Sequence, residues 1–116
     1  MTQNDLQKLA EKLWNTYCEI FPKLVKFDCP RVEWNNRFTT TGGISYSERR
    51  LVQLAGKFFV KYPDEMLQVT LPHELAHQID YDLNGWKYRA KHHRDSWKII
   101  MVKIGLPPEI YHTMVL

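Results

Sequence analysis

Apolar residues recur at intervals of three and four near the start of the chain. The repeating set comprises Leu6, Leu9, Ala10, Leu13, Trp14, Tyr17, Ile20 and Phe21. Such spacing gathers apolar side chains on one face of an α-helix. It therefore predicts an amphipathic helix over about residues 2–21, whose apolar face belongs to the hydrophobic core. Pro22 ends this helix, because proline cannot continue the helical hydrogen-bond ladder.

The next part of the chain has the pattern of short strands. Val32 and Trp34 alternate with polar neighbours, and the runs at residues 44–46 and 51–54 predict two more strands. These two runs are joined by an expected turn, in which the arginine pair at residues 49–50 lies. The apolar run at residues 58–60 has two interpretations, an extension of the sheet or a short buried segment.

Helical spacing returns in the second half of the chain. An apolar stripe over residues 67–83 predicts a helix, and its members are Leu71, Leu75, Ala76, Ile79 and Leu83. Pro72 either lies in the first turn of this helix or kinks a helix that begins near Asp64. After a turn at residues 84–85, a second helix is expected over residues 95–104.

The order of these elements defines the expected fold. One N-terminal helix, a small three-stranded sheet, antiparallel or mixed, and two C-terminal helices make an α+β protein. The short connection between the two C-terminal helices predicts that they pack as an antiparallel pair. The 116 residues are expected to form one domain, residues 1–116.

Composition narrows the class of protein only a little. The net charge is +3 and 44% of the residues are hydrophobic, as in an ordinary globular domain. There is no apolar run long enough to cross a membrane, and the polar N-terminal residues lack the apolar stretch of a secretion signal. We therefore expect a cytoplasmic protein without membrane contact. Cys18 and Cys29 have no C-x-x-C spacing and are interpreted as reduced, partly buried thiols.

One motif within the predicted helices carries specific chemistry. His73-Glu74-Leu75-Ala76-His77 has the pattern H-E-x-x-H, which is typical of zinc metallopeptidases. Two histidines four residues apart lie on one face of a helix, so both imidazoles can bind one Zn²⁺ ion. Glu74 can reach a water molecule in the site and is the natural general base. The alternative is an amphipathic helix whose histidines are solvated or packed.

A catalytic zinc ion usually has three protein ligands, so one more is needed. The metzincin arrangement requires a glycine and a histidine where this chain has Asp80 and Leu83, which excludes that family. His93, directly before the second predicted helix, is the preferred third ligand. His92 is the alternative, and His112 is interpreted as a tail or packing residue.

The sequence also offers residues that could support such a site. Asp80, Asp82 and Asp95 are candidates for carboxylates that orient the zinc-binding histidines. Tyr88 and Arg94 are candidates for stabilising the oxyanion, because they lie close to His93 in the sequence. The sequence does not rank the members of either group.

The connection before the last helix is rich in basic and aromatic residues. It contains Lys87, Arg89, Lys91, Arg94 and Lys98, with Trp86, Tyr88 and Trp97 between them. Such a mixture suits a nucleic-acid backbone with stacked bases. The competing interpretation is a solvated loop whose aromatic side chains belong to the core.

These residues together resemble the SprT-like (Spartan-related) zinc metallopeptidases. The discriminating part is the H-E-x-x-H motif followed by His93-Arg94-Asp95-Ser96-Trp97, where the family has H-G-x-x-[FW] with the third zinc ligand. Upstream, residues 34–37, the glycine pair at residues 42–43 and residues 50–54 are similar to the family's strand, glycine-rich turn and strand. Residues 105–112 are similar to the end of the family's peptidase domain. The resemblance covers residues 5–112.

The resemblance implies a zincin-like zinc metallopeptidase that hydrolyses peptide bonds. It implies one Zn²⁺ bound by His73, His77 and His93, with Glu74 as the catalytic base. It further implies protein substrates bound or crosslinked to DNA, activation by single-stranded DNA, and association with the nucleoid. The residues expected to contact nucleic acid or substrate are Lys87, Tyr88, Arg89, Lys91 and Arg94.

Two departures from the family pattern change these expectations. Arg94 stands where the family has glycine, which alters the backbone freedom after the third ligand and adds a cation at the rim of the site. The zinc ribbon that many relatives carry after the peptidase domain is not expected in this chain, so DNA contact would need a partner or the basic connection. The rival function is a zinc-stabilised nucleic-acid-binding or adaptor module without turnover, and a third is a general peptidase without a DNA link. Glu74 favours an enzyme, because a structural zinc site needs no carboxylate there.

Overall fold

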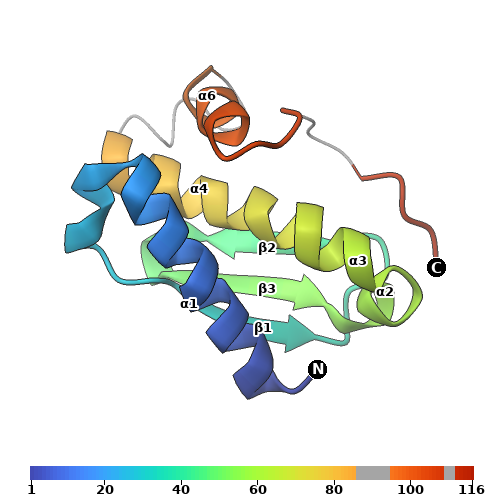
Figure 1. Ribbon diagram of the computed structural model, residues 1–116. Coiled ribbons are helices and arrows are strands. Elements are labelled where there is room, and N and C mark those ends of the chain that lie inside the picture. The colour runs from blue at the N-terminus through green and yellow to red at the C-terminus, as the bar shows by residue number, and fades with distance from the viewer. Residues whose placement is uncertain (86–94, 109–111) are drawn as a thin grey trace.

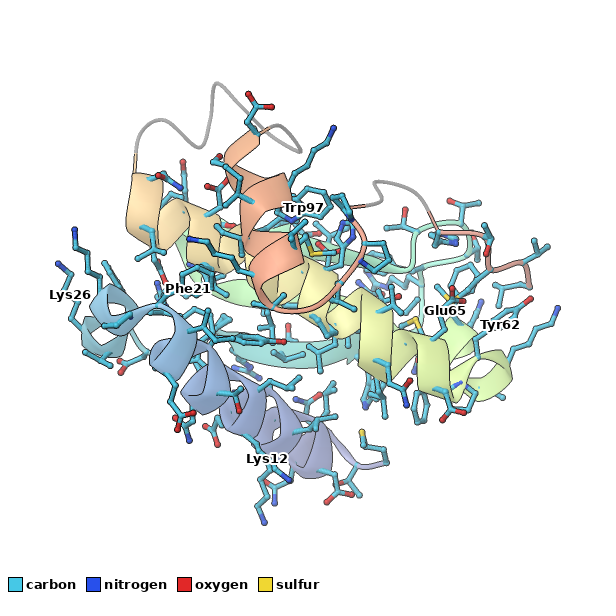
Figure 2. The ribbon with its side chains drawn as sticks, turned by 45° about the horizontal axis from the view of Figure 1, so that its top comes forward. Lys12, Phe21, Lys26, Tyr62, Glu65 and Trp97 are labelled. Atoms are coloured by element: carbon cyan, nitrogen blue, oxygen red, sulfur yellow. The ribbon has the colours of Figure 1, made fainter. Side chains whose placement is uncertain are left out.

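The computed structural model describes residues 1–85, 95–108 and 112–116, and it has the predicted α+β architecture (Figure 1). Helix α1 (Gln3–Ile20) and helix α4 (Leu71–Asn84) pack against a three-stranded sheet. Helix α6 (Asp95–Lys103) packs on α4 on the side away from the sheet. The prediction that the last two helices are antiparallel is wrong, since α6 crosses α4 in both views (Figures 1 and 2).

Helix α1 confirms the range predicted from its apolar spacing. Its N-terminus has a capping box, in which the Thr2 hydroxyl accepts a bond from the Asp5 amide and the Asp5 carboxylate accepts one from the Thr2 amide. The buried face consists of Leu6, Ala10, Trp14 and Tyr17. Ile20, which the pattern assigned to the same face, is 40% exposed because the helix ends there, before Pro22.

The three predicted strands are present and form a mixed sheet. Strand β3 (Leu51–Ala55) is central, β1 (Arg31–Asn35) runs parallel to it and β2 (Gly43–Tyr46) runs antiparallel to it. The predicted turn between β2 and β3 is a 3₁₀ turn (Ser47–Arg49), followed by Arg50 in the left-handed conformation at φ 50°. Both β1 and β2 are therefore edge strands.

Residues 58–60 belong to a helix, which corrects the predicted extension of the sheet. They lie in α2 (Gly56–Lys61), directly after β3. Phe58 is buried in the core, whereas Val60 is 84% exposed. The exposures differ because the helical turn directs Phe58 inward and Val60 outward. The second interpretation of residues 58–60, a short buried segment, is therefore correct only in part.

The helix that carries the H-E-x-x-H motif is preceded by further helical turns. The short helix α3 (Pro63–Glu65) leads into a π-helical turn (Met66–Thr70), which runs directly into α4. Within the π turn the Leu71 amide donates to the carbonyl of Met66. Pro72 explains this turn, because proline has no amide hydrogen and its ring clashes with the preceding turn of a regular helix. Both interpretations of Pro72 therefore hold in part, because helical turns begin near Asp64 and Pro72 lies in the first turn of α4 itself.

The two cysteines are free and half-buried, as predicted. Burial raises the pKa of the Cys29 thiol to about 12, so its reactive thiolate form is scarce at neutral pH. None of the helices in the described part of the chain combines the length and the apolar character needed to cross a membrane.

Side-chain amides of α1 cover the outer edge of β1. Gln7 accepts a hydrogen bond from the Val32 amide at 2.8 Å and donates one to the Pro30 carbonyl at 3.2 Å. Gln3, one helical turn earlier, donates to the Val32 carbonyl at 2.5 Å and accepts from the Trp34 amide at 3.3 Å. The two amides thus take the place of a neighbouring strand, and they satisfy an edge that could otherwise pair with another chain.

We expect Gln7→Ala to destabilise the protein and to expose the β1 edge. Two partly buried hydrogen bonds are lost, which costs about 1–2 kcal/mol of the free energy of unfolding. Chemical denaturation measures this loss, and analytical ultracentrifugation measures self-association through the uncovered edge. Asn4→Ala, which removes an exposed amide from the same helical turn, is the matched control. Equal stability and an unchanged sedimentation profile for the two variants would show that the Gln7 amide does not protect the edge.

Candidate metal centre

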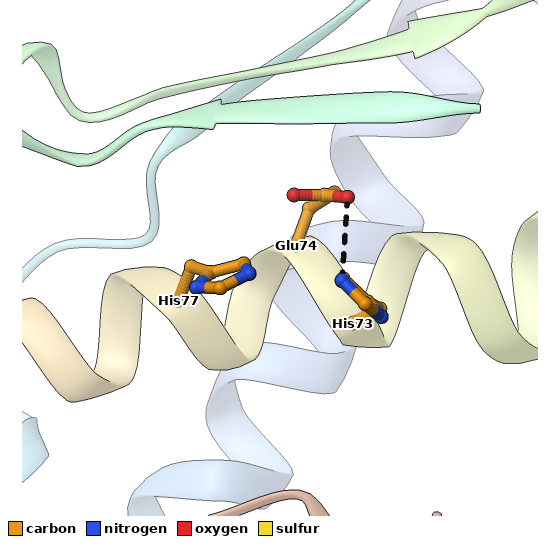
Figure 3. A group of neighbouring side chains, drawn as sticks. All are labelled: His73, Glu74 and His77. Atoms are coloured by element: carbon orange, nitrogen blue, oxygen red, sulfur yellow. Dashed lines mark ion pairs between the residues drawn. The ribbon is translucent and has the colours of Figure 1, made fainter. Parts of the chain in front are cut away.

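Helix α4 brings His73, Glu74 and His77 together. Each residue offers one ligand atom, and these atoms lie within 4.8 Å of one another. The two imidazoles are one helical turn apart with ring centroids 5.3 Å apart, and His73 Nε2 lies 3.9 Å from Glu74 Oε2. Figure 3 shows the glutamate rising from the helix toward the sheet beside the two histidines. The convergence predicted from the four-residue spacing is therefore present.

The Glu74 side chain is buried and touches the edge strand β2. Its carboxylate accepts a hydrogen bond from the backbone amide of Ser45. Loss of solvent raises the pKa of the Glu74 carboxyl from 4.5 to about 8, and the Ser45 amide acts in the opposite direction. A carboxyl group with a raised pKa at a site of this kind is suited to exchanging protons near neutral pH.

The register of the sheet explains why the Ser45 amide is available. The Ala55 amide donates to the Gly42 carbonyl, so Gly42 faces β3. Because backbone groups alternate in direction along an antiparallel edge, Gly43 and Ser45 direct their amides and carbonyls outward. Glu74 occupies the outward amide at Ser45.

Two glycines allow this close approach of strand and helix. A Cβ atom on Gly43 would lie 3.1 Å from Cγ of Glu74 and 3.0 Å from Cδ2 of Leu54. A Cβ atom on Gly42 would lie 3.5 Å from Cγ2 of Thr70, in the π turn before the motif. The Gly43 distances are tighter than ordinary van der Waals contact, so a side chain there would press on Glu74 and Leu54, whereas the Gly42 distance to Thr70 is an ordinary contact. The glycine pair that the sequence showed before β2 therefore has a packing role beside the site.

Trp97 projects from α6 (Figure 2). It is fully buried and forms one wall of the histidine pair. Its ring stacks on His77 at 5.1 Å with an interplanar angle of 15°, and it meets the edge of His73 at 4.7 Å. The indole Nε1 also donates to the His73 carbonyl at 3.4 Å. Trp97 therefore belongs to the core, as the competing interpretation of the basic and aromatic segment held. It is not exposed for stacking on a nucleic-acid base.

Hydrogen bonds from the second half of α4 hold the helix against the sheet. Asp82 pairs with the Arg50 guanidinium at 2.6 Å, and the same guanidinium donates to the Asp28 carbonyl. Gln78 donates to the Ser47 carbonyl at 3.1 Å and to Asp82 at 3.2 Å. In these contacts Asp82 positions the helix rather than orienting a histidine.

Asp80 connects α4 with α6. Its buried carboxylate accepts hydrogen bonds from the Asn84 amide at 2.5 Å and the Ser96 hydroxyl at 3.2 Å. Asp95 lies in the first turn of α6, where a negative charge is favoured by the helix dipole. Of the three candidate orienting carboxylates, Asp80 is thus the one whose contacts join the motif helix to the helix behind the histidines.

The donor set fits a zinc ion. Two imidazole nitrogens and a carboxylate on one helical turn are the groups that zinc prefers in catalytic sites. His77 and Glu74 are buried, while the His73 side chain is 15% exposed, so one side of the group remains accessible. The geometry shows a possible metal-binding cluster and does not by itself identify the metal.

The remaining predicted site residues lie outside the described residues, in the segment 86–94. They are His93, the preferred third ligand, and Lys87, Tyr88, Arg89, Lys91 and Arg94. His112 is described, and it packs as predicted: its Nε2 lies 2.8 Å from the Thr40 carbonyl, and its ring meets the edge of Phe58 at 5.2 Å.

Sequence reasoning missed two contributors to the site. The Ser45 backbone amide has no residue-type signal, and only its position in the strand next to the glycine pair could have drawn attention to it. Trp97 was noticed as part of a motif, but its contact with both histidines depends on the crossing of α6 over α4.

Comparisons with known proteins agree with the geometry. The profile of the SprT-like family matches residues 6–112. "Protein SprT" of Actinobacillus succinogenes is 32% identical over 87 residues, which cover 74% of this chain and 49% of that protein. "Protein SprT-like" of Anoxybacillus flavithermus is 31% identical over 108 residues, which cover 92% of this chain and 65% of that protein. The chain spans about half the length of the curated SprT relatives it matches first. No solved structure matches it significantly.

We expect Trp97→Phe to weaken metal binding, because the smaller ring stacks less well on His77 and cannot donate to the His73 carbonyl. Loss of groups that orient zinc-binding histidines lowers affinity by about tenfold or more. Competition with a chromophoric chelator measures the zinc affinity.

Trp14→Phe is the matched control for this prediction. Trp14 is also buried, and its indole donates to the Phe27 carbonyl at 3.1 Å rather than to a residue of the motif. Both variants should lose about 1–2 kcal/mol of stability, but only Trp97→Phe should lose zinc affinity. Equal zinc affinities in the two variants would show that Trp97 packs in the core without affecting metal binding.

Proposed function

The chain belongs to the SprT-like family, and on this basis we propose that it is a zinc-dependent metallopeptidase that hydrolyses peptide bonds. One observation carries the proposal: the buried Glu74 carboxylate lies between two histidines that converge on one face of α4, beside an edge strand with outward backbone groups. A site that only stabilised the fold would have no use for this carboxylate.

We assign the metal ligands to His73 and His77 on α4 and to His93 in the segment 86–94. Three neutral imidazoles leave room for water and substrate at a fourth position. Zinc bound there would polarise the scissile carbonyl and acidify a neighbouring water molecule. Trp97 and α6 close the back of the histidine pair against solvent, which fixes the ring orientations.

Glu74 acts as the general base in this proposal. Its carboxylate takes a proton from the attacking water molecule and later delivers that proton to the leaving amine. In the metal-free site, burial raises the pKa of Glu74 and so favours its holding a proton, while the Ser45 amide favours the carboxylate form that accepts one. The Ser45 amide holds the carboxylate on the β2 side of the site.

An extended polypeptide is the substrate that the edge of β2 favours. Outward amides and carbonyls on an edge strand bind an extended chain by strand addition. The hydrogen bonds are made to the backbone of the added chain rather than to its side chains. The β1 edge is covered by Gln3 and Gln7, whereas the Gly43 end of β2 lies next to Glu74. Strand addition at β2 would therefore bring a peptide bond to the catalytic group.

We further propose that the substrates are proteins bound or crosslinked to DNA. The support is the family relationship together with the basic residues of the segment 86–94, namely Lys87, Arg89, Lys91 and Arg94. Cationic side chains next to an active site would hold the DNA to which a substrate protein is attached. Single-stranded DNA is the proposed activator, and a partner protein could supply further DNA contacts.

Glu74→Gln should abolish proteolysis and leave zinc bound. Removing a general base lowers the rate by about 10²–10⁴-fold, while the glutamine keeps the size of the side chain. The measurement is cleavage of a basic DNA-binding protein by the zinc-loaded chain, with zinc content determined in parallel. Glu19→Gln, an exposed change on α1, is the control and should cleave at the wild-type rate. Full zinc occupancy without any Glu74-dependent cleavage would favour a binding or adaptor module instead.

DNA binding should weaken when the basic segment is neutralised. Replacing Lys87, Arg89 and Lys91 by glutamine should flatten the dependence of log Kd on log salt by about 0.7 per lost phosphate contact with single-stranded DNA. Fluorescence anisotropy at several salt concentrations gives this slope. The matched control replaces the exposed Lys8, Lys12 and Lys23 by glutamine and has the same net charge. Identical slopes in both triple variants would contradict DNA binding by the basic segment and would favour a peptidase without a link to DNA.

A further inference from the structure

The segment formed by residues 112–116 is fastened beside the start of β2, and we call it the strap. It lies next to α2 on the side of the molecule where α4 begins (Figure 1). Met114 is 5% exposed and belongs to the hydrophobic core. The neighbouring side chains Val115 and Leu116 are exposed, so the strap is held by the side chains of Met114 and His112 and by its backbone.

Tyr62 and Lys61 clasp the backbone of the strap. The Tyr62 hydroxyl donates to the Val115 carbonyl at 2.8 Å and accepts from the Val115 amide at 3.1 Å. The Lys61 ammonium donates to the same carbonyl at 2.7 Å. One hydroxyl group thus satisfies both backbone groups of Val115, which makes Tyr62 the position from which the strap can be released. Figure 2 shows Tyr62 at the same end of the molecule as the strap.

The strap also touches the residues that lead into β2. His112 Nε2 lies 2.8 Å from the Thr40 carbonyl. A Cβ atom on Gly42 would be 3.1 Å from the Met114 methyl group and 3.5 Å from the His112 ring. The next residue, Gly43, is the one that contacts Glu74. The strap therefore covers the chain directly before the outward edge at Gly43 and Ser45.

We propose that the strap closes one end of the substrate-binding edge of β2 and limits how far an extended polypeptide reaches on that side of the scissile bond. This inference rests on the proposed peptidase function. A substrate strand that paired with Gly43 and continued toward Thr40 would meet Met114 and the His112 ring. The strap leaves the edge beside Glu74 open and excludes further pairing upstream of Gly42. It is thus a steric determinant of substrate length on one side only.

The test uses Lys61→Met and Tyr62→Phe combined with His112→Ala in the full chain, which removes both members of the clasp and the Thr40 contact but keeps Met114. Tyr17→Phe, which removes a buried hydroxyl from α1, is the matched control. Hydrogen exchange of the segment that contains Val115 reports release of the strap without reference to activity. Two peptide series share one cleavable core and are lengthened by single residues at either the N-terminal or the C-terminal end.

Affinity for both series is measured on the zinc-loaded Glu74→Gln variant, and kcat/KM is measured on the active chain. In the chain with the strap in place, the affinity for one peptide series should stop rising beyond a certain peptide length. In the variant with the released strap, the affinity for the same series should continue to rise beyond that length. Each newly allowed backbone pair should contribute about fivefold in affinity, and the other series should be unchanged. Faster exchange of the strap with both length profiles unchanged overturns the inference. Length-dependent binding without cleavage by the active chain retains the strap as a determinant of binding and contradicts the peptidase proposal alone.

Discussion

Buried polar side chains on helix α4 are the constraint on which the arrangement of this protein depends. Glu74, His77, Gln78 and Asp80 lie within two helical turns, and all are buried. A buried polar group without a partner is costly, so neighbouring elements must supply hydrogen bonds or ring contacts. Strand β2 supplies the Ser45 amide and the following turn supplies the Ser47 carbonyl, while α6 supplies the Ser96 hydroxyl and the Trp97 ring. The chemistry of the motif and the packing of the fold are therefore satisfied by the same contacts.

Arg50 shows how one residue can fix several of these elements at once. Its left-handed backbone ends the turn between β2 and β3, and its guanidinium binds Asp82 of α4 and the Asp28 carbonyl. The same group lies 6.0 Å from the Trp14 ring centroid on α1. The Asp82 side chain in this ion pair is buried, so the cost of removing its charge from water offsets much of the attraction between the two groups. Here the guanidinium has several partners from different elements, and its main effect is on the position of α4 relative to the sheet.

The sequence was sufficient for the elements whose signals are local. The spacing of Leu6, Ala10 and Trp14 predicts α1, and the alternation around Val32 predicts β1, because each pattern reflects burial of one face. The four-residue spacing of His73 and His77 likewise predicts that the two side chains lie close together on one face of a helix. Contacts between distant segments carry no such signal. The Gln3 and Gln7 amides on β1, the Arg50–Asp82 pair and the crossing of α6 over α4 depend on how whole elements pack, and the helical state of residues 58–60 depends on where β3 ends.

The π turn before α4 determines which way the motif faces. Met66 and Leu71 are five residues apart, and both are fully buried. In a regular α-helix, two side chains at this spacing would point to different faces of the helix. The extra residue of the turn restores the common face, and Pro72 makes the wider turn favourable because it has no amide to donate. With the turn in place, the apolar side of α4 stays in the core, and Glu74 on the next turn meets β2 at the glycine pair. A proline directly before the first histidine thus has a geometric consequence for the glutamate, which its sequence position alone did not indicate.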